Sequence, residues 1–216
     1  MQSEAVQIAP DDEDPLLALM QADEDDLLRL AQAGDEEAFG VILLKMDAPL
    51  RRFVRRLVGT SDAEDDIVQD VFIALYRNLN SVNPDRGLRP YLYRMVRNRT
   101  YDELRKQGRY RVYSLDDEPT DAYASFETIP DGREEPEEVA HWLLIQLEVR
   151  EAIDRLPENQ RQALILFAEE GLSYAEIAEA MNTNIGTIKS RLFHAKQSLR
   201  RLVRPEVLEA LDAELR

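Results

Sequence analysis

Apolar residues recur at spacings of three and four along most of this 216-residue chain, which is the period of an amphipathic helix. Glycine is sparse, with eight residues in the whole chain, and almost every patterned stretch shows the helical period. The pattern therefore predicts an all-α protein. The helical stretches fall into two groups, residues 27–107 and residues 140–203, and the segment between them shows little periodicity.

The first group predicts one helical domain over residues 27–107. A helix is expected from about Leu27, and Asp35 can cap a longer helix that follows it. Pro49 lies inside this longer helix, where it should kink or break it because proline lacks the backbone N–H and clashes with the preceding turn.

Further along the same domain, Ser61 and Glu64 have the spacing of a capping box, which predicts a helix that ends near Asn78. A turn-rich loop follows at residues 83–89. Pro90 then suits the first turn of another helix, which should run to about residue 106.

The second group, residues 140–203, ends in a helix-turn-helix pattern. Ser173 and Glu176 form a capping box for a short helix, and Asn182 to Asn184 predict a turn. The next helix carries one apolar stripe: Ile185, Ile188, Leu192, Ala195, Leu199 and Leu202. Its outer face is then Thr187, Lys189, Ser190, Arg191, His194 and Lys196. This face predicts DNA binding in the major groove, although a solvated basic face is the simpler alternative.

The net charge of −16 is unevenly distributed. Residues 1–38 carry a net charge of −11 and residues 113–141 a net charge of −9, whereas residues 39–112 and residues 181–204 each carry +6. Only the two basic blocks can gain energy from DNA phosphates. The acidic segments would repel DNA, which suggests a protein partner or an autoinhibitory role for them.

The remaining segments are expected to be an acidic disordered head at 1–26, an acidic flexible linker at 108–139 and a tail at 204–216. The chain has no cysteine, which excludes disulfides and thiolate metal sites. It also lacks the metalloprotease, phosphate-loop and hydrolase motifs, so we expect no enzyme, no metal and no cofactor. No apolar run approaches membrane-spanning length and the acidic N-terminus is unlike a signal peptide, so a cytoplasmic protein without membrane insertion is expected.

Two helices of the first domain carry candidate chemistry. Asp66, Gln69, Asp70 and Ile73 follow helical spacing and form a mostly acidic stripe, which is either a solvated face or a protein-binding face. On the last helix of this domain an aromatic and polar face combines side chains that stack on bases, hold phosphates and read base edges: Tyr91, Arg94, Asn98, Asp102 and Arg105, with Arg97 nearby. Tyr93 is expected to pack in the core.

These segments, in this order, resemble the bacterial RNA polymerase sigma factors of the extracytoplasmic-function (ECF) group. Residues 62–72 resemble region 2.2 of that family, residues 89–98 resemble region 2.3, and residues 102–105 resemble region 2.4. Residues 156–202 resemble region 4, most specifically at Gly186-Thr187-Ile188-Lys189-Ser190-Arg191-Leu192.

The resemblance implies two helical domains, like sigma regions 2 and 4, and the following partners. Core RNA polymerase would be bound at its β′ clamp helices and β flap, with the clamp helices contacting Asp66, Gln69, Asp70 and Ile73. The minus-ten element would be recognised and melted by Asn83, Arg86, Arg89, Tyr91, Arg94, Arg97, Asn98, Asp102 and Arg105. The minus-thirty-five element would be read by Thr187, Lys189, Ser190, Arg191, His194 and Lys196. An anti-sigma factor is a further candidate partner, and the linker would thread toward the polymerase active-site cleft.

Two positions depart from the family pattern: Tyr91 stands where tryptophan is more common, and His194 stands where arginine is common. The main alternative function is a helix-turn-helix regulator that binds duplex DNA without acting as a polymerase subunit. That alternative leaves the acidic stripe and the Tyr91 face without a role.

Overall fold

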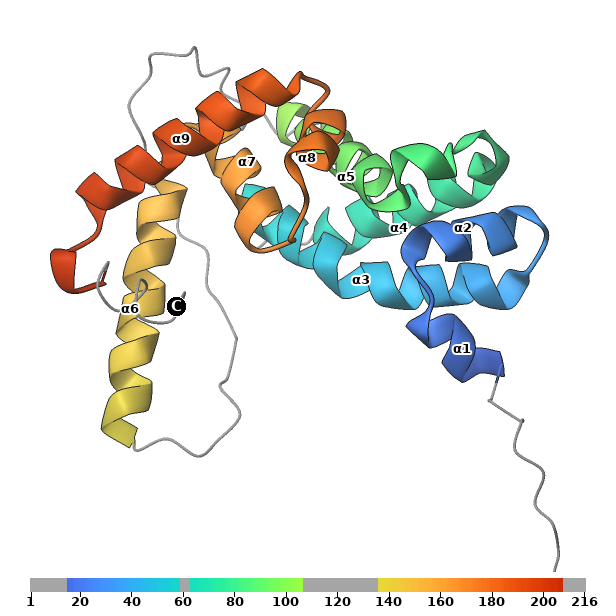
Figure 1. Ribbon diagram of the computed structural model, residues 1–216, viewed down its shortest axis with the longest axis horizontal. Coiled ribbons are helices and arrows are strands. Elements are labelled where there is room, and N and C mark those ends of the chain that lie inside the picture. The colour runs from blue at the N-terminus through green and yellow to red at the C-terminus, as the bar shows by residue number, and fades with distance from the viewer. Residues whose placement is uncertain (1–14, 59–62, 107–135, 208–216) are drawn as a thin grey trace, which may run out of the picture.

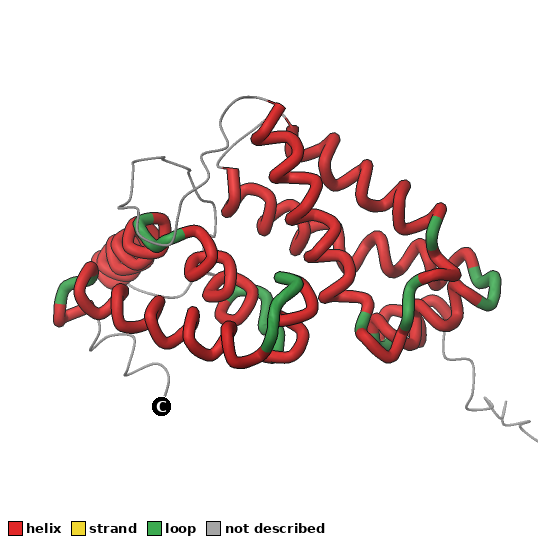
Figure 2. Tube along the Cα trace, turned by 90° about the horizontal axis from the view of Figure 1, so that it is seen from above, coloured by secondary structure: helices red, strands yellow, loops and turns green. Residues whose placement is uncertain are grey.

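The computed structural model describes residues 15–58, 63–106 and 136–207, excluding the side chains of 136–142. Figures 1 and 2 show helices joined by short loops, and no strand, within these segments. The α-helices are α1 (Pro15–Gln21), α2 (Glu24–Gln32), α3 (Glu36–Val58), α4 (Ala63–Arg77), α5 (Leu88–Lys106), α6 (Pro136–Asp154), α7 (Glu158–Ala168), α8 (Tyr174–Ala180) and α9 (Ile185–Leu202), with short 3-10 helices at Leu79–Ser81 (η1) and Pro84–Arg86 (η2). None of the helices in these segments is long and apolar enough to cross a bilayer.

Helices α2 to α5 form the first domain, which packs around one apolar core. Leu28 from α2, Phe53 from α3, Leu75 from α4 and Leu92 from α5 are completely buried there. Asp35 caps α3 as predicted, because its Oδ1 accepts the Ala38 backbone N–H at 3.0 Å. This bundle fixes the orientation of α4 and α5, the two helices that carry the candidate chemistry.

The structure contradicts two expectations for the first domain, a break of the helix at Pro49 and disorder up to residue 26. Helix α3 continues through Pro49, and Met46 before the proline and Leu50 after it are buried in the same core, so packing outweighs the missing hydrogen bond. Residues 15–26, assigned to the disordered head, instead form α1 and the first turn of α2. Residues 1–14 and the capping residue Ser61 lie outside the described segments.

Helices α7 to α9 form the second domain, and its capping residues act as predicted. Ser173 and Glu176 make the reciprocal capping box of α8, at 3.3 Å and 2.8 Å. Ile188, Leu192 and Ala195 are buried, so the apolar stripe of α9 is confirmed in its centre. Its two ends differ from the prediction: Ile185 is 44% exposed and Leu202 is 38% exposed.

Helix α6 extends away from both bundles and contacts the C-terminal end of α9 (Figure 1). Ile145 and Ala152 of α6 pack there with Val203 and Val207. Residues 136–139 therefore belong to a helix rather than to the linker, and Val207 of the predicted tail is packed. Residues 107–135 lie outside the described segments.

The two domains pack directly against each other, with α5 beside α8 and α3 beside α7. This contact was not predicted from the sequence, which indicated two domains and a flexible connection. It covers part of the candidate face of α5, including Arg94 and Arg97.

Candidate functional site

The acidic stripe lies on the exposed side of α4. Asp66, Gln69, Asp70 and Ile73 are all exposed, and Ile73 is 42% exposed although it is apolar. Arg99 of α5 donates to the Asp70 carboxylate at 2.8 Å. The structure therefore presents the predicted residues together on one surface, with an apolar side chain at its end.

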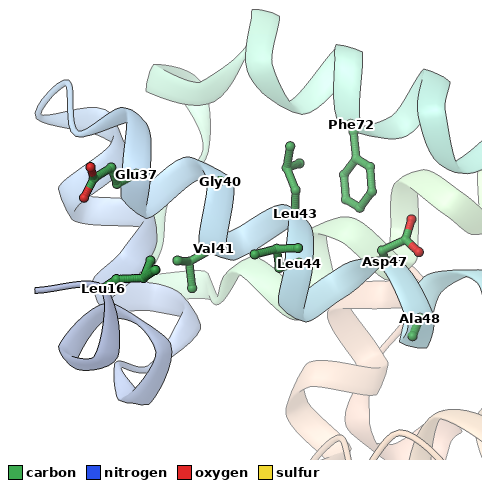
Figure 3. Close-up of a pocket in the computed structure, with 9 residues that line it drawn as sticks. All are labelled: Leu16, Glu37, Gly40, Val41, Leu43, Leu44, Asp47, Ala48 and Phe72. Atoms are coloured by element: carbon green, nitrogen blue, oxygen red, sulfur yellow. The ribbon is translucent and has the colours of Figure 1, made fainter. Parts of the chain in front are cut away.

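An apolar groove between α3 and α4 adjoins this stripe and was missed by the sequence reasoning. In Figure 3, Leu43 of α3 and Phe72 of α4 point toward each other, and Leu44 lies on the outer side of α3. Leu44 is 69% exposed. The groove, about 800 Å³ in volume, continues toward the stripe at Ile73 and Tyr76. The sequence signal was the pair Leu43-Leu44, which adds apolar surface beside the core residues Val41, Ile42 and Met46.

The loop at residues 83–89 folds as a 3-10 turn that leads into α5. The Asn83 side chain accepts the Asp85 backbone N–H at 2.9 Å and thereby caps the turn. Gly87 has a φ of +84°, which disfavours any residue with a side chain. Asn83 and Arg86 are exposed, so the tip of the loop is open to solvent.

On α5 the polar face is divided into an open part and a covered part. Asn98, Asp102 and Arg105 are exposed. Arg94 is covered by the second domain, where its guanidinium donates to Glu179 of α8 at 2.6 Å. Arg97 is covered in the same way and donates to Gln162 of α7 at 2.9 Å.

The tyrosines of α5 occupy three different environments. Tyr91 is half-buried, with the Arg94 guanidinium 5.4 Å from its ring centroid. Tyr93 is completely buried, as expected for a core residue, and Tyr101 is buried as well. Burial raises the pKa of both buried phenols well above the usual value, so each stays protonated and donates a hydrogen bond to a glutamate of the second domain.

The centre of the domain contact is a buried polar cluster around Glu170, whose side chain is 1% exposed. Its carboxylate accepts from Arg52 of α3 at 3.0 and 3.1 Å and from the Tyr93 hydroxyl at 2.6 Å. Arg89 donates to the Glu170 backbone carbonyl. Next to this cluster, Arg56 pairs with Glu169 at 2.8 Å. The cluster satisfies its buried charges mutually, which is required for burying them.

The basic face of α9 is largely open. Lys189, Ser190, His194 and Lys196 are exposed, whereas Thr187 and Arg191 are half-buried. The Arg191 guanidinium lies 4.0 Å from the Met181 sulfur, and burial, followed by the charge of Arg97, lowers its pKa from the usual value. In the described segments, no three or more carboxylate or imidazole groups lie close enough together to hold a metal ion.

Both halves of this arrangement match known families. The family model described as sigma-70 region 2 matches residues 46–110, and the model described as sigma-70, region 4 matches residues 146–199. The RNA polymerase sigma-H factor of Pseudomonas aeruginosa is 31% identical over 177 residues, which cover 82% of this chain and 91% of that protein. The ECF RNA polymerase sigma-E factor of Escherichia coli K12 is 34% identical over 177 residues, with coverage of 79% and 89%.

A solved structure shows the same architecture. The sigma factor RpoE of Bartonella quintana, in complex with the anti-sigma factor NepR, matches with a TM-score of 0.53 and 26% identity, covering 74% of this chain and 92% of that chain.

Regions 2 and 4 together define a two-domain transcription initiation factor. The chain belongs to the ECF RNA polymerase sigma factors. This membership confirms the all-α two-domain prediction and favours a sigma factor over a duplex-binding regulator.

Proposed function

We propose that this sigma factor binds core RNA polymerase through α4, opens the minus-ten element with α5 and its preceding loop, and reads the minus-thirty-five element with α9. The main observation is that the three surfaces lie on different helices of two domains, and that most of their residues are exposed. An anti-sigma factor is a further proposed partner, as it is for the relative from Bartonella quintana. The protein would act in the cytoplasm and reach the nucleoid through polymerase.

The proposed polymerase surface combines the acidic stripe of α4 with the adjoining groove. Asp66, Gln69 and Asp70 supply polar contacts, and Ile73 and Tyr76 continue them onto apolar surface. An exposed apolar patch bordered by acids fits a partner helix that carries apolar and basic side chains. The polymerase β′ clamp helices are the partner that we propose for it.

The proposed promoter contacts require the two domains to separate. Arg94 and Arg97 cannot hold DNA phosphates while they hold Glu179 and Gln162. The side-chain oxygens of Glu179 and Gln162 therefore occupy the place of phosphates in the closed arrangement. Polymerase, which would bind the two domains at separate points, can exchange these contacts for promoter DNA.

Run-off transcription with core polymerase tests the function as a whole. We expect transcripts from a set of promoters of the source genome only when both core polymerase and this chain are present. Tight binding of the free chain to duplex DNA, without any effect on polymerase, would instead support the alternative function, a helix-turn-helix regulator that is not a polymerase subunit.

Within α9, base reading and phosphate binding should be separable by mutation. Residues in the early turns of a recognition helix reach base edges, so Lys189→Ala and Arg191→Ala should change the preference at particular base pairs, each at a cost of about 1–3 kcal/mol. Lys196→Ala should weaken binding to all promoters to a similar extent. It should also reduce the slope of log affinity against log salt concentration by about one.

A promoter-library selection with each α9 variant measures these effects. Lys196 lies 5.2 Å from the ring centroid of Phe167, so its variant also needs a thermal melting control. An unchanged base preference in both Lys189→Ala and Arg191→Ala would show that sequence is read by other residues.

A further inference from the structure

Helix α2 contacts the loop that precedes α5 at both of the loop's ends. It lies outside residues 46–110, the part of the chain that matches sigma region 2. Three of its side chains nevertheless reach the segment from Leu79 to Leu88. These contacts join residues that are 47 to 63 positions apart in the sequence.

At the end of the loop, Asp25 caps α5 from another helix. Its Oδ1 accepts the backbone N–H of Leu88, the first residue of α5, at 2.6 Å. A carboxylate at this position satisfies a donor that the helix itself leaves unpaired, and it interacts favourably with the helix dipole. Its other oxygen lies 3.9 Å from the position that a side chain on Gly87 would take, so the loop passes close to it.

At the start of the loop, Gln32 holds two backbone carbonyls with one amide group. Its Nε2 donates to Leu79 O and to Val82 O, each at 2.8 Å. Val82 is buried and directly precedes Asn83. Gln32 is half-buried, so water is a poor substitute for these two bonds.

The third contact differs from the other two. Arg29 pairs with Asp85 at 3.3 Å, but half of the arginine side chain and 85% of the aspartate side chain are exposed. Exposed ion pairs of this kind contribute little to the stability of the folded arrangement. Asp25 and Gln32 therefore fix the two ends of the loop, and the exposed tip with Asn83 and Arg86 is left open to a ligand.

We infer that Asp25 and Gln32 are positioning residues for minus-ten base recognition, because they set the backbone of the loop that carries Asn83 and Arg86. The inference rests on the proposed role of that loop. A base-specific contact depends on placing the donor and acceptor atoms to within a fraction of an ångström. Releasing either end of the loop should therefore reduce discrimination between bases more than it reduces total binding.

The test uses the full chain assembled with core polymerase, and a pool of short single-stranded DNA with a randomised central stretch. Sequencing the bound fraction gives the base preference at each position. Gln32→Met keeps the length of the side chain but removes the two donors. This variant should reduce discrimination between bases at the position that the loop contacts by about fivefold, which is less than the discrimination that one complete base contact contributes. Asp25→Ala should have the same effect.

Matched variants separate positioning from general destabilisation. Asp25→Asn keeps an oxygen that can accept the Leu88 N–H, so it should restore most of the discrimination. Arg29→Ala removes the exposed pair on the same helix and should leave the preference unchanged. Amide hydrogen exchange of the chain should show faster exchange at Leu88 in Asp25→Ala but not in Asp25→Asn.

Three outcomes would overturn the inference. The first is an unchanged preference in both Gln32→Met and Asp25→Ala. The second is an equal loss of discrimination at every position of the randomised stretch, since it would indicate only reduced stability. The third is an unchanged preference in Asn83→Ala and Arg86→Ala, which would remove the proposed role of the loop itself and thus be distinguishable from the first two.

Discussion

Asp66→Arg should weaken the binding of this sigma factor to core RNA polymerase by at least about tenfold, because a close charge pair at an interface couples by roughly 1.5 kcal/mol or more. Asp66 is exposed on α4, so the variant should fold normally. Asp70→Arg should also weaken binding, but it would place a second arginine beside Arg99, which now donates to Asp70. Titration of labelled chain with core polymerase measures both effects.

The matched control is Glu36→Arg. Glu36 is an exposed acid at the start of α3, so the variant makes the same change of charge at another point of the first domain. Its affinity for polymerase should stay close to that of the unmodified chain. Undiminished binding by the double variant Asp66→Arg/Asp70→Arg would remove the stripe from the polymerase surface.

Sequence reasoning was most successful where the interaction is local. Capping by Asp35 and by Ser173 with Glu176 links residues three positions apart, so the spacing itself carries the information. The exposure of the stripe on α4 follows from the same periodicity that buries Ile67 and Val71 on the other side of the helix. These signals predicted the helices and most of the candidate surfaces.

The acidic run at residues 23–26 was interpreted as disorder, and the structure shows why that was wrong. Asp23 caps α2 by accepting the Asp25 backbone N–H at 2.8 Å, and Glu24 to Asp26 occupy the first helical turn. Negative charge is favourable there because it faces the positive end of the helix dipole. Composition alone did not distinguish this arrangement from a solvated acidic tail.

The contact between the domains could not be predicted, because it depends on residues far apart in the sequence. Arg94 and Glu179 are 85 positions apart, and Arg52 and Glu170 are 118 positions apart. No spacing rule relates such pairs. Arg94 and Arg97 were therefore assigned to DNA and Tyr93 to the core, and their partners Glu179, Gln162 and Glu170 were missed.

Arg94→Ala should reduce transcription from duplex promoters by about tenfold or more, since a charge-assisted hydrogen bond contributes roughly 1.5–3 kcal/mol. A template with a pre-melted bubble should restore much of the activity, because the arginine is proposed to act in strand separation. Asn98→Ala should behave in the same way. Asn98 is exposed and is not one of the residues described at the domain contact. Polymerase binding by both variants should be unchanged.

Glu179→Ala is the control that separates DNA contact from domain contact. It breaks the same 2.6 Å ion pair as Arg94→Ala but keeps the guanidinium that is proposed to hold DNA. Its activity on duplex promoters should be retained, because the pair must open before promoter binding in any case. If Glu179→Ala lost as much activity as Arg94→Ala, the effect would come from the domain contact. An equal loss on duplex and bubble templates would contradict a role of Arg94 in melting.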